Sequence, residues 1–114
     1  MAGESGGGYI CSGAMVQLAM NEEGALVKLS IPINPMLDNY EFTSKESLTK
    51  QEVAKFQIMQ QIWKAIAGSD FESERSKWNP LLFPGKASEE LLSKMPPTIV
   101  WAAEFDLYIA QATR

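Results

Sequence analysis

The chain has 114 residues, 46% of them hydrophobic, which is enough for one modest domain. Its formal net charge of −4 argues against nucleic acid or an anionic membrane as a partner. No apolar run approaches the roughly 18 residues of a membrane span, and the N-terminus lacks the features of a signal peptide. The single cysteine, Cys11, cannot form an internal disulfide and is expected to be buried and unreactive. These observations predict a cytoplasmic protein, and no motif calls for a metal or an organic cofactor.

The first chemical motif lies at the glycine-rich N-terminus, where Gly3, Ser5 and Gly7 form the pattern Gly-x-Ser-x-Gly. This pattern is typical of a sharp strand-to-helix turn that exposes a nucleophilic serine hydroxyl. Glycines flank the serine because the strained backbone brings neighbouring Cβ positions too close together. A Gly/Ser-rich N-terminus is also typical of a flexible tag or linker, so the motif alone leaves two interpretations open.

Two elements that suit such a turn follow Ser5. Apolar positions near helical spacing predict a helix over residues 7–20. Residues 26–33 form a short, β-branched apolar run that is typical of a buried parallel strand, and Asn34 and Pro35 then signal a turn. The order of turn, helix and strand predicts a βαβ unit in which the strand before the serine is very short.

The next segment, residues 40–95, is predicted to be a long insert that contains helices. A capping-box pattern at Thr49 opens a helix with one apolar stripe, and Gly68 ends it. A second helix of one or two turns is expected over residues 88–92. Residues 98–103 are predicted to form another parallel strand, because the two prolines before them exclude a helix there.

Together, these segments resemble the α/β-hydrolase fold-3 family, the hormone-sensitive-lipase-like branch. Residues 3–8, Gly-Glu-Ser-Gly-Gly-Gly, match the family's elbow pattern G-[DE]-S-[AG]-G-G at all six places. Further matches follow in the family's order: residues 34–38 to its x-P-x-x-D segment, 47–56 to a helix start, 79–81 to a Ser/Asn-Pro-Leu segment, and 95–106 to a proline-led strand with an acidic turn.

The resemblance implies the α/β fold class, as a partial α/β-hydrolase domain over residues 1–114 with parallel strands, flanking helices and an incomplete sheet. The expected parts are an elbow and helix at 3–24, a strand at 26–33, an insert with helices at 40–95, and a strand at 98–103 followed by an aspartate turn. Because parallel strands need neighbours, the chain is expected to be part of a larger fold. It would then associate with the remainder of that fold or with itself.

The resemblance also implies a carboxylesterase-type serine hydrolase that acts on small esters with short to medium acyl groups. Ser5 would be the nucleophile, Asp106 would orient a catalytic histidine, and the N–H of Gly6 would donate to the oxyanion. The sequence contains no histidine and no His-Gly-Gly oxyanion motif. The 114-residue chain alone is therefore expected to be inactive. Within the predicted helix after Thr49, Phe56, Met59 or Trp63 either packs on the sheet or lines an acyl pocket.

Alternatives remain at several of these positions. Relatives continue D-P-L-x-D-E after the catalytic aspartate, whereas Asp106 is followed by Leu107 and further apolar residues, so Asp106 is alternatively a turn or helix-capping residue. Glu4 is expected to be structural and Asp38 to be a loop or hinge residue. A non-catalytic hydrolase-fold module, used for binding or as a structural subunit, is the alternative function. The unmodified elbow with Ser5 favours the enzyme.

Overall fold

The computed structural model describes residues 1–38, 49–68, 71, 77 and 79–104. The chain divides into two compact units, Met1–Asp38 with Trp78–Arg114, and Asn39–Lys77. The first unit contains strands β1 (Ala2–Glu4) and β2 (Ile31–Ile33), helices α1 (Gly6–Met20) and α4 (Glu89–Ser93), and 3₁₀ turns η1 (Gly24–Leu26) and η4 (Pro84–Lys86). The second unit contains helix α2 (Lys50–Ala67).

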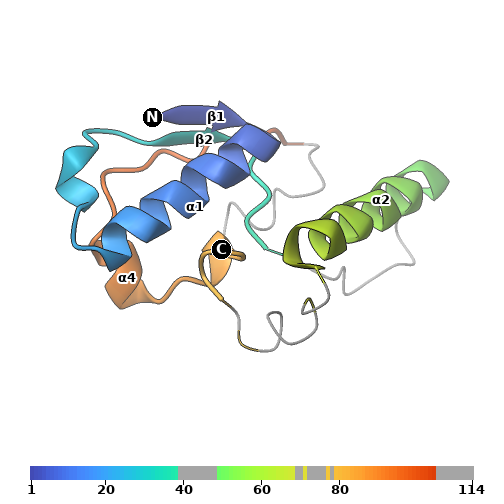
Figure 1. Ribbon diagram of the computed structural model, residues 1–114. Helices are drawn as coiled ribbons and strands as arrows, with labels where there is room; N and C mark the ends of the chain where they lie inside the picture. Colours follow the sequence, from blue (N-terminus) through green and yellow to red (C-terminus); the bar gives the residue numbers. More distant parts are fainter. Residues whose placement is uncertain (39–48, 69–70, 72–76, 78, 105–114) are drawn as a thin grey trace. The chain divides into compact units, whose positions relative to one another are not determined.

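The core of the first unit is a βαβ arrangement. β1 and β2 are parallel, with Ala2 opposite Ile31 and Glu4 opposite Ile33, and α1 connects them and contacts both (Figure 1). The helix predicted at residues 7–20 is confirmed as α1. Its buried residues recur at helical spacing and face the sheet: Cys11, Met15, Val16 and Ala19.

The expectation that Cys11 is buried is confirmed. Its Sγ lies 3.3 Å from the hydroxyl oxygen of Ser30, which is also fully buried. This contact joins α1 to the residue just before β2. Burial away from solvent keeps the thiol from behaving as a reactive cysteine.

A third segment lies parallel to β2 on the side away from β1. Ser30 pairs with Thr98 and Ile33 with Trp101, both in parallel register. The prediction that the segments at 26–33 and 98–103 are parallel neighbours is therefore confirmed. β2 becomes the middle of three parallel segments, so the described part of the fold has the parallel strands and flanking helix expected of the α/β class.

The predicted strand lengths were wrong at both segments. Only Ile31–Ile33 of the run at 26–33 is strand, because Gly24–Leu26 forms η1 and leaves Leu26 73% exposed. A Cβ on Gly24 would clash with the carbonyl oxygen of Lys94, so the chain turns tightly against α4 before it reaches the sheet. The prediction was wrong because the first residues of this apolar run face solvent instead of the core.

Pro32 explains why the third segment pairs only at isolated positions. Ser30 N–H donates to Pro97 O, Ile99 N–H to Ser30 O, and Trp101 N–H to Pro32 O. A parallel ladder in this register also requires an N–H at position 32 that donates to Ile99 O, and proline has none. The missing rung interrupts the ladder, so residues 98–103 do not form the continuous strand that was predicted.

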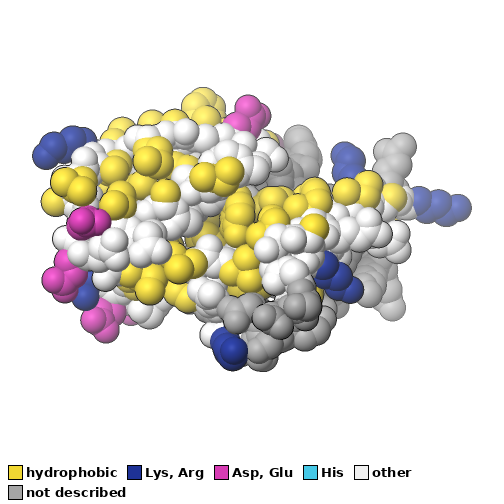
Figure 2. All heavy atoms as spheres, viewed as in Figure 1, with side chains coloured by type: hydrophobic (Ala, Val, Ile, Leu, Met, Phe, Trp, Pro, Cys, Tyr) yellow, Lys and Arg dark blue, Asp and Glu magenta, His cyan; other side chains and the backbone are white. Residues whose placement is uncertain are grey.

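The two faces of this sheet differ in their cover. Thr98 and Val100 line a cavity of about 380 Å³ together with Pro32 and α1 residues, which places them on the α1 face. Side chains alternate along extended backbone, so Ile99 and Trp101 lie on the opposite face, where they are 57% and 66% exposed. Figure 2 shows hydrophobic side chains on the face of the molecule that it draws.

The second unit is described by its helix. Val53 N–H donates to Thr49 O, and Gly68 follows the helix with φ +67°, so the predicted start and end are confirmed. Trp63 and Phe71 are buried. Whether a residue of α2 lines an acyl pocket stays a prediction. None of the helices in the described ranges is long and apolar enough to span a membrane.

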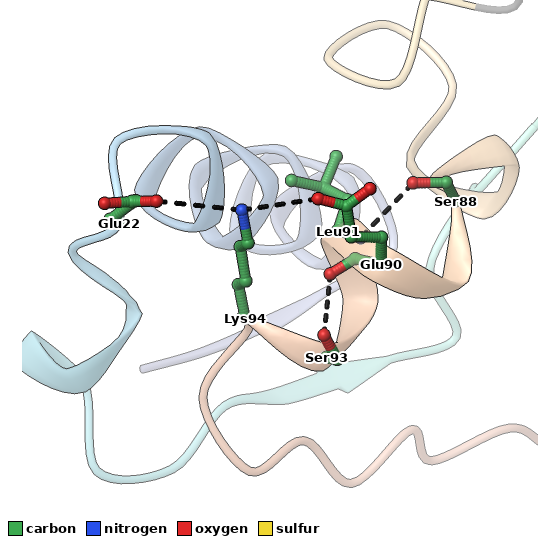
Figure 3. A network of polar contacts seen from close by, with 6 residues as sticks. All are labelled: Glu22, Ser88, Glu90, Leu91, Ser93 and Lys94. Atoms are coloured by element: carbon green, nitrogen blue, oxygen red, sulfur yellow. Dashed lines mark hydrogen bonds and ion pairs between the residues drawn. The ribbon is translucent and has the colours of Figure 1, made fainter.

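Polar contacts join helix α4 to the turn that follows α1 (Figure 3). The Lys94 ammonium lies 3.7 Å from a carboxylate oxygen of Glu22 and 3.6 Å from one of Glu90. Leu91 N–H donates to the Ser88 hydroxyl at 3.2 Å, which caps the helix as the predicted turn over residues 88–92 requires. The ion pairs are exposed and contribute little to stability. The cap stabilises α4 itself, and the close backbone approach of Lys94 to Gly24 limits where the end of α4 can lie.

Replacing the capping serine should therefore destabilise the fold. We expect Ser88→Ala to lower the free energy of unfolding by about 1 kcal/mol, measured by urea titration. Ser93→Ala is the matched control, because the Ser93 hydroxyl only donates to Glu90 O on the exposed surface and should change stability by less than about 0.5 kcal/mol. Equal losses in the two variants would contradict the capping role.

Candidate active site

Ser5 occupies the sharp turn between β1 and α1. Its backbone has φ 53° and ψ −116°, a conformation that costs a non-glycine residue on the order of 1–3 kcal/mol. The residue is exposed, and its hydroxyl makes no capping hydrogen bond to the described first turn of α1. The strand-to-helix turn predicted from the glycine pattern is thus confirmed, and the flexible-tag interpretation is excluded for these residues.

Close backbone approach makes two of the elbow glycines necessary. A Cβ on Gly3 would clash with the Gly7 carbonyl oxygen, and a Cβ on Gly8 would lie 2.9 Å from Ile33 O and 3.0 Å from Gly3 O. A Cβ on Gly7 meets nothing within 4 Å. The close contacts predicted around the serine are present, but they involve Gly3 and Gly8 and not Gly7. Gly8 lies outside the Gly-x-Ser-x-Gly pattern but within the six-residue elbow match at residues 3–8, and its close contact is with the end of β2.

Backbone hydrogen bonds hold the turn on both sides of Ser5. Ser5 N–H donates to Ile33 O at 2.9 Å, and Tyr9 N–H donates to Ser5 O at 3.0 Å, which begins the helical pattern. The N–H groups of the first helical turn have no acceptor within a helix, and they carry its positive dipole end. The amide of Gly6, the first residue of α1, belongs to this group and follows the serine directly.

The neighbouring strand ends converge beside Ser5. Asn34 N–H donates to Trp101 O at 2.7 Å, and Ala103 N–H donates to the Asn34 Oδ1 at 2.8 Å. The exit of the third segment thus lies at the same carboxyl edge as the serine, where ligands bind in sheets of this kind. Asp106, the predicted acid, is three residues beyond Ala103 and lies outside the described residues.

Two further acidic residues were considered in the sequence. Asp38 is 2% exposed, and its Oδ2 lies 3.5 Å from the Lys86 ammonium in η4. The ion pair ties the loop after β2 to η4, in agreement with its predicted role as a loop residue. Glu4 is exposed at the end of β1, next to Ser5. Its predicted structural role stays a prediction.

Tyr9 lies one turn after Ser5 on α1 and is half-buried. Burial raises the pKa of its hydroxyl above the ordinary value of 10.0, because desolvation disfavours the phenolate. The phenol therefore stays protonated at neutral pH.

Comparison with known proteins agrees with this geometry. The family profile described as alpha/beta hydrolase fold matches residues 1–114, so the chain belongs to the α/β-hydrolase fold-3 family. No curated protein and no solved structure matches the chain significantly. Membership confirms the family expected from the sequence motifs, whose members are generally hydrolytic enzymes.

The crowding at the elbow predicts unequal effects for two glycine substitutions. We expect Gly3→Ala to lower the free energy of unfolding by at least about 2 kcal/mol, because the added methyl group displaces the backbone of Gly7. Gly7→Ala adds the same methyl group in open space and should be neutral or slightly stabilising. Urea unfolding of both variants measures the difference. Similar losses would mean that the turn is less tightly packed than described.

The raised pKa of Tyr9 predicts how stability depends on alkaline pH. Above the ordinary pKa the unfolded chain ionises at Tyr9 before the folded chain does, so the free energy of unfolding falls as pH rises past about 10. We expect this fall to be smaller in Tyr9→Phe, measured by urea unfolding between pH 8 and pH 11. Parallel pH profiles for the two proteins would contradict the burial effect.

Proposed function

We propose that the chain carries the nucleophile of a serine carboxylic-ester hydrolase. The observation that supports this most strongly is the exposed Ser5 in a strained turn at the carboxyl end of a parallel strand. The fold keeps this turn despite its conformational cost, which is typical of residues held for chemistry. The hydroxyl would attack the carbonyl carbon of a small ester with a short to medium acyl group, as the family resemblance implies.

The oxyanion formed in that attack needs donors fixed in advance. Gly6 N–H follows the nucleophile at the start of α1, where a hydrogen-bond donor and the helix dipole favour negative charge. A donor of this kind contributes roughly 3–4 kcal/mol to transition-state stabilisation in serine hydrolases. We assign Gly6 this role in the proposed mechanism.

Activation of the serine requires a base that the 114 residues do not contain. A histidine would take the proton from the Ser5 hydroxyl and return it to the leaving alcohol, and Asp106 would orient its imidazole. The sequence has no histidine, so in this proposal the base comes from another polypeptide segment. The described end of the third segment supports the assignment of Asp106, because Ala103 is bonded to Asn34 at the carboxyl edge that carries Ser5.

The proposal includes association through the open sheet. Parallel strands are usually covered on both faces, whereas Ile99 and Trp101 lie exposed on the face opposite α1. Either the remainder of the hydrolase fold or a second copy of the chain would bury this face. We also propose a cytoplasmic location, in which the buried Cys11 remains reduced.

A non-catalytic binding or structural role is the second candidate. The complete absence of histidine and the apolar continuation after Asp106 favour it. The strained turn favours the enzyme, because a binding module gains nothing from a costly conformation at an exposed serine. The two functions differ in one measurable respect, which is whether the Ser5 hydroxyl is needed for ester turnover.

The test is hydrolysis of p-nitrophenyl butyrate by the 114-residue chain and by the full-length protein, meaning the chain joined to the segment that supplies the histidine in this proposal. We expect the chain alone to remain near background, because loss of the catalytic base costs about 10⁴–10⁶ in rate. We expect the full-length protein to turn over the ester and Ser5→Ala or Asp106→Asn to abolish this activity.

Ser93→Ala serves as the control, since it removes an exposed hydroxyl far from the elbow along the chain. A full-length protein that is inactive, or one whose activity survives Ser5→Ala, would overturn the esterase proposal. A chain that alone turns over ester much faster than its Ser5→Ala variant would show that a base other than histidine is acting.

A further inference from the structure

We propose that Asn34 is a positioning residue, whose side chain fixes the backbone that leads to the catalytic acid. This inference rests on the proposed function, because it assigns Asn34 a role toward Asp106. Asn34 follows β2 directly and stands next to Ile33, the residue whose carbonyl oxygen accepts the Ser5 N–H. It therefore lies between the nucleophile and the third segment.

The hydrogen bonds along β2 show what the side chain does. The residues at 30, 32 and 34 face the third segment, and the last main-chain bond of this ladder is Asn34 N–H to Trp101 O. The next bond in a parallel ladder would run from Ala103 N–H to the carbonyl oxygen of residue 34. Here the Asn34 Oδ1 accepts that N–H instead, at 2.8 Å. The side chain extends the ladder by one rung.

The backbone conformation of Asn34 explains this exchange. Its φ is +43°, in the left-handed region, so its main chain turns out of the extended path. Asparagine and aspartate adopt this region more readily than other residues with a Cβ. The residue thus meets two demands together: it allows the chain to leave the sheet toward Pro35, and it supplies the acceptor that the departing main chain no longer offers.

The consequence reaches both sides of the site. Ser5 N–H is bonded to Ile33 O, Asn34 N–H to Trp101 O, and Ala103 N–H to the Asn34 side chain. These bonds form a row across the carboxyl edge of the three segments. In the sequence Asp106 follows Ala103 by three residues, so in the proposed mechanism a fixed backbone at Ala103 would restrict the chain that carries the catalytic acid. A displacement of about 1 Å between catalytic groups costs on the order of 100-fold in rate.

Three substitutions separate the acceptor from the backbone requirement. Asn34→Asp keeps both the acceptor and the tolerance of positive φ, Asn34→Gly keeps only the tolerance, and Asn34→Ala keeps neither. In the 114-residue chain we expect the Ala103 amide hydrogen to exchange about tenfold faster in Asn34→Gly than in wild type, and at nearly the wild-type rate in Asn34→Asp. Equal exchange in wild type and Asn34→Gly would overturn the hydrogen bond and the proposal.

Ester turnover by the full-length protein tests the role toward the acid. We expect Asn34→Gly to lower kcat about tenfold with KM within about twofold, and Asn34→Asp to restore most of the loss. Ser88→Ala is the control, since it removes a helix cap on α4 and should lower stability without lowering kcat. An unchanged kcat in Asn34→Gly, or an equal loss in Ser88→Ala, would overturn the positioning role.

The two readouts also separate this inference from the esterase proposal. Activity that survives Ser5→Ala would overturn the proposed function, and the role of Asn34 toward Asp106 with it. The exchange rate of Ala103 would still establish or exclude the hydrogen bond. If Ser5 is essential and Asn34→Gly is fully active, only the positioning role is wrong.

Discussion

The parallel pairing of β2 is the constraint on which the rest of the described structure depends. Its residues alternate between two neighbours: Ile31 N–H donates to Met1 O and Ile33 O accepts from Ser5, whereas Ser30 and Asn34 bond the third segment. A strand of three residues thereby holds β1, the elbow and the segment at 98–103 in one register. Without β2, the serine turn would have no fixed partner, and the exits of the outer segments would no longer share an edge.

The strained backbone conformation of Ser5 persists because close packing on both sides of the turn prevents a relaxed one. Gly3 and Gly8 bring strand, helix and the end of β2 into backbone contact, and any Cβ at these positions would force them apart. This contact stabilises α1 against the sheet, and it also presents the serine hydroxyl and the Gly6 amide in a fixed relation. A stable fold and the fixed serine turn therefore depend on the same two glycines.

Local signals predicted the helices better than the extent of the strands. The glycine pattern at the elbow and the apolar spacing of α1 are short-range features, and the turn and the helix that they predict are both present. The strand at 26–33 was predicted too long because Gly24–Leu26 turns against Lys94, a residue distant in the chain, and leaves Leu26 exposed. The interruption at Pro32 arises because its nitrogen faces the third segment. Only the register of the strands shows this, so the sequence could not predict it. For Asn34, the Asn-Pro pair signalled a turn, but its acceptor role required knowledge that Ala103 lies beside it.

The exposed apolar face of the sheet and the elbow lie at different places, so a partner could cover one without the other. Ile99 and Trp101 project from the side opposite α1, whereas Ser5 and Asn34 lie at the carboxyl edge. A partner that buries the apolar face would gain hydrophobic stabilisation without covering Ser5. The catalytic base of the proposed mechanism, in contrast, would have to approach along the carboxyl edge. Since Trp101 contributes a side chain to the open face and a backbone oxygen to the Asn34 bond, burying that face would also steady the row of hydrogen bonds beside the serine. Association and the geometry of the site would then be coupled through one residue.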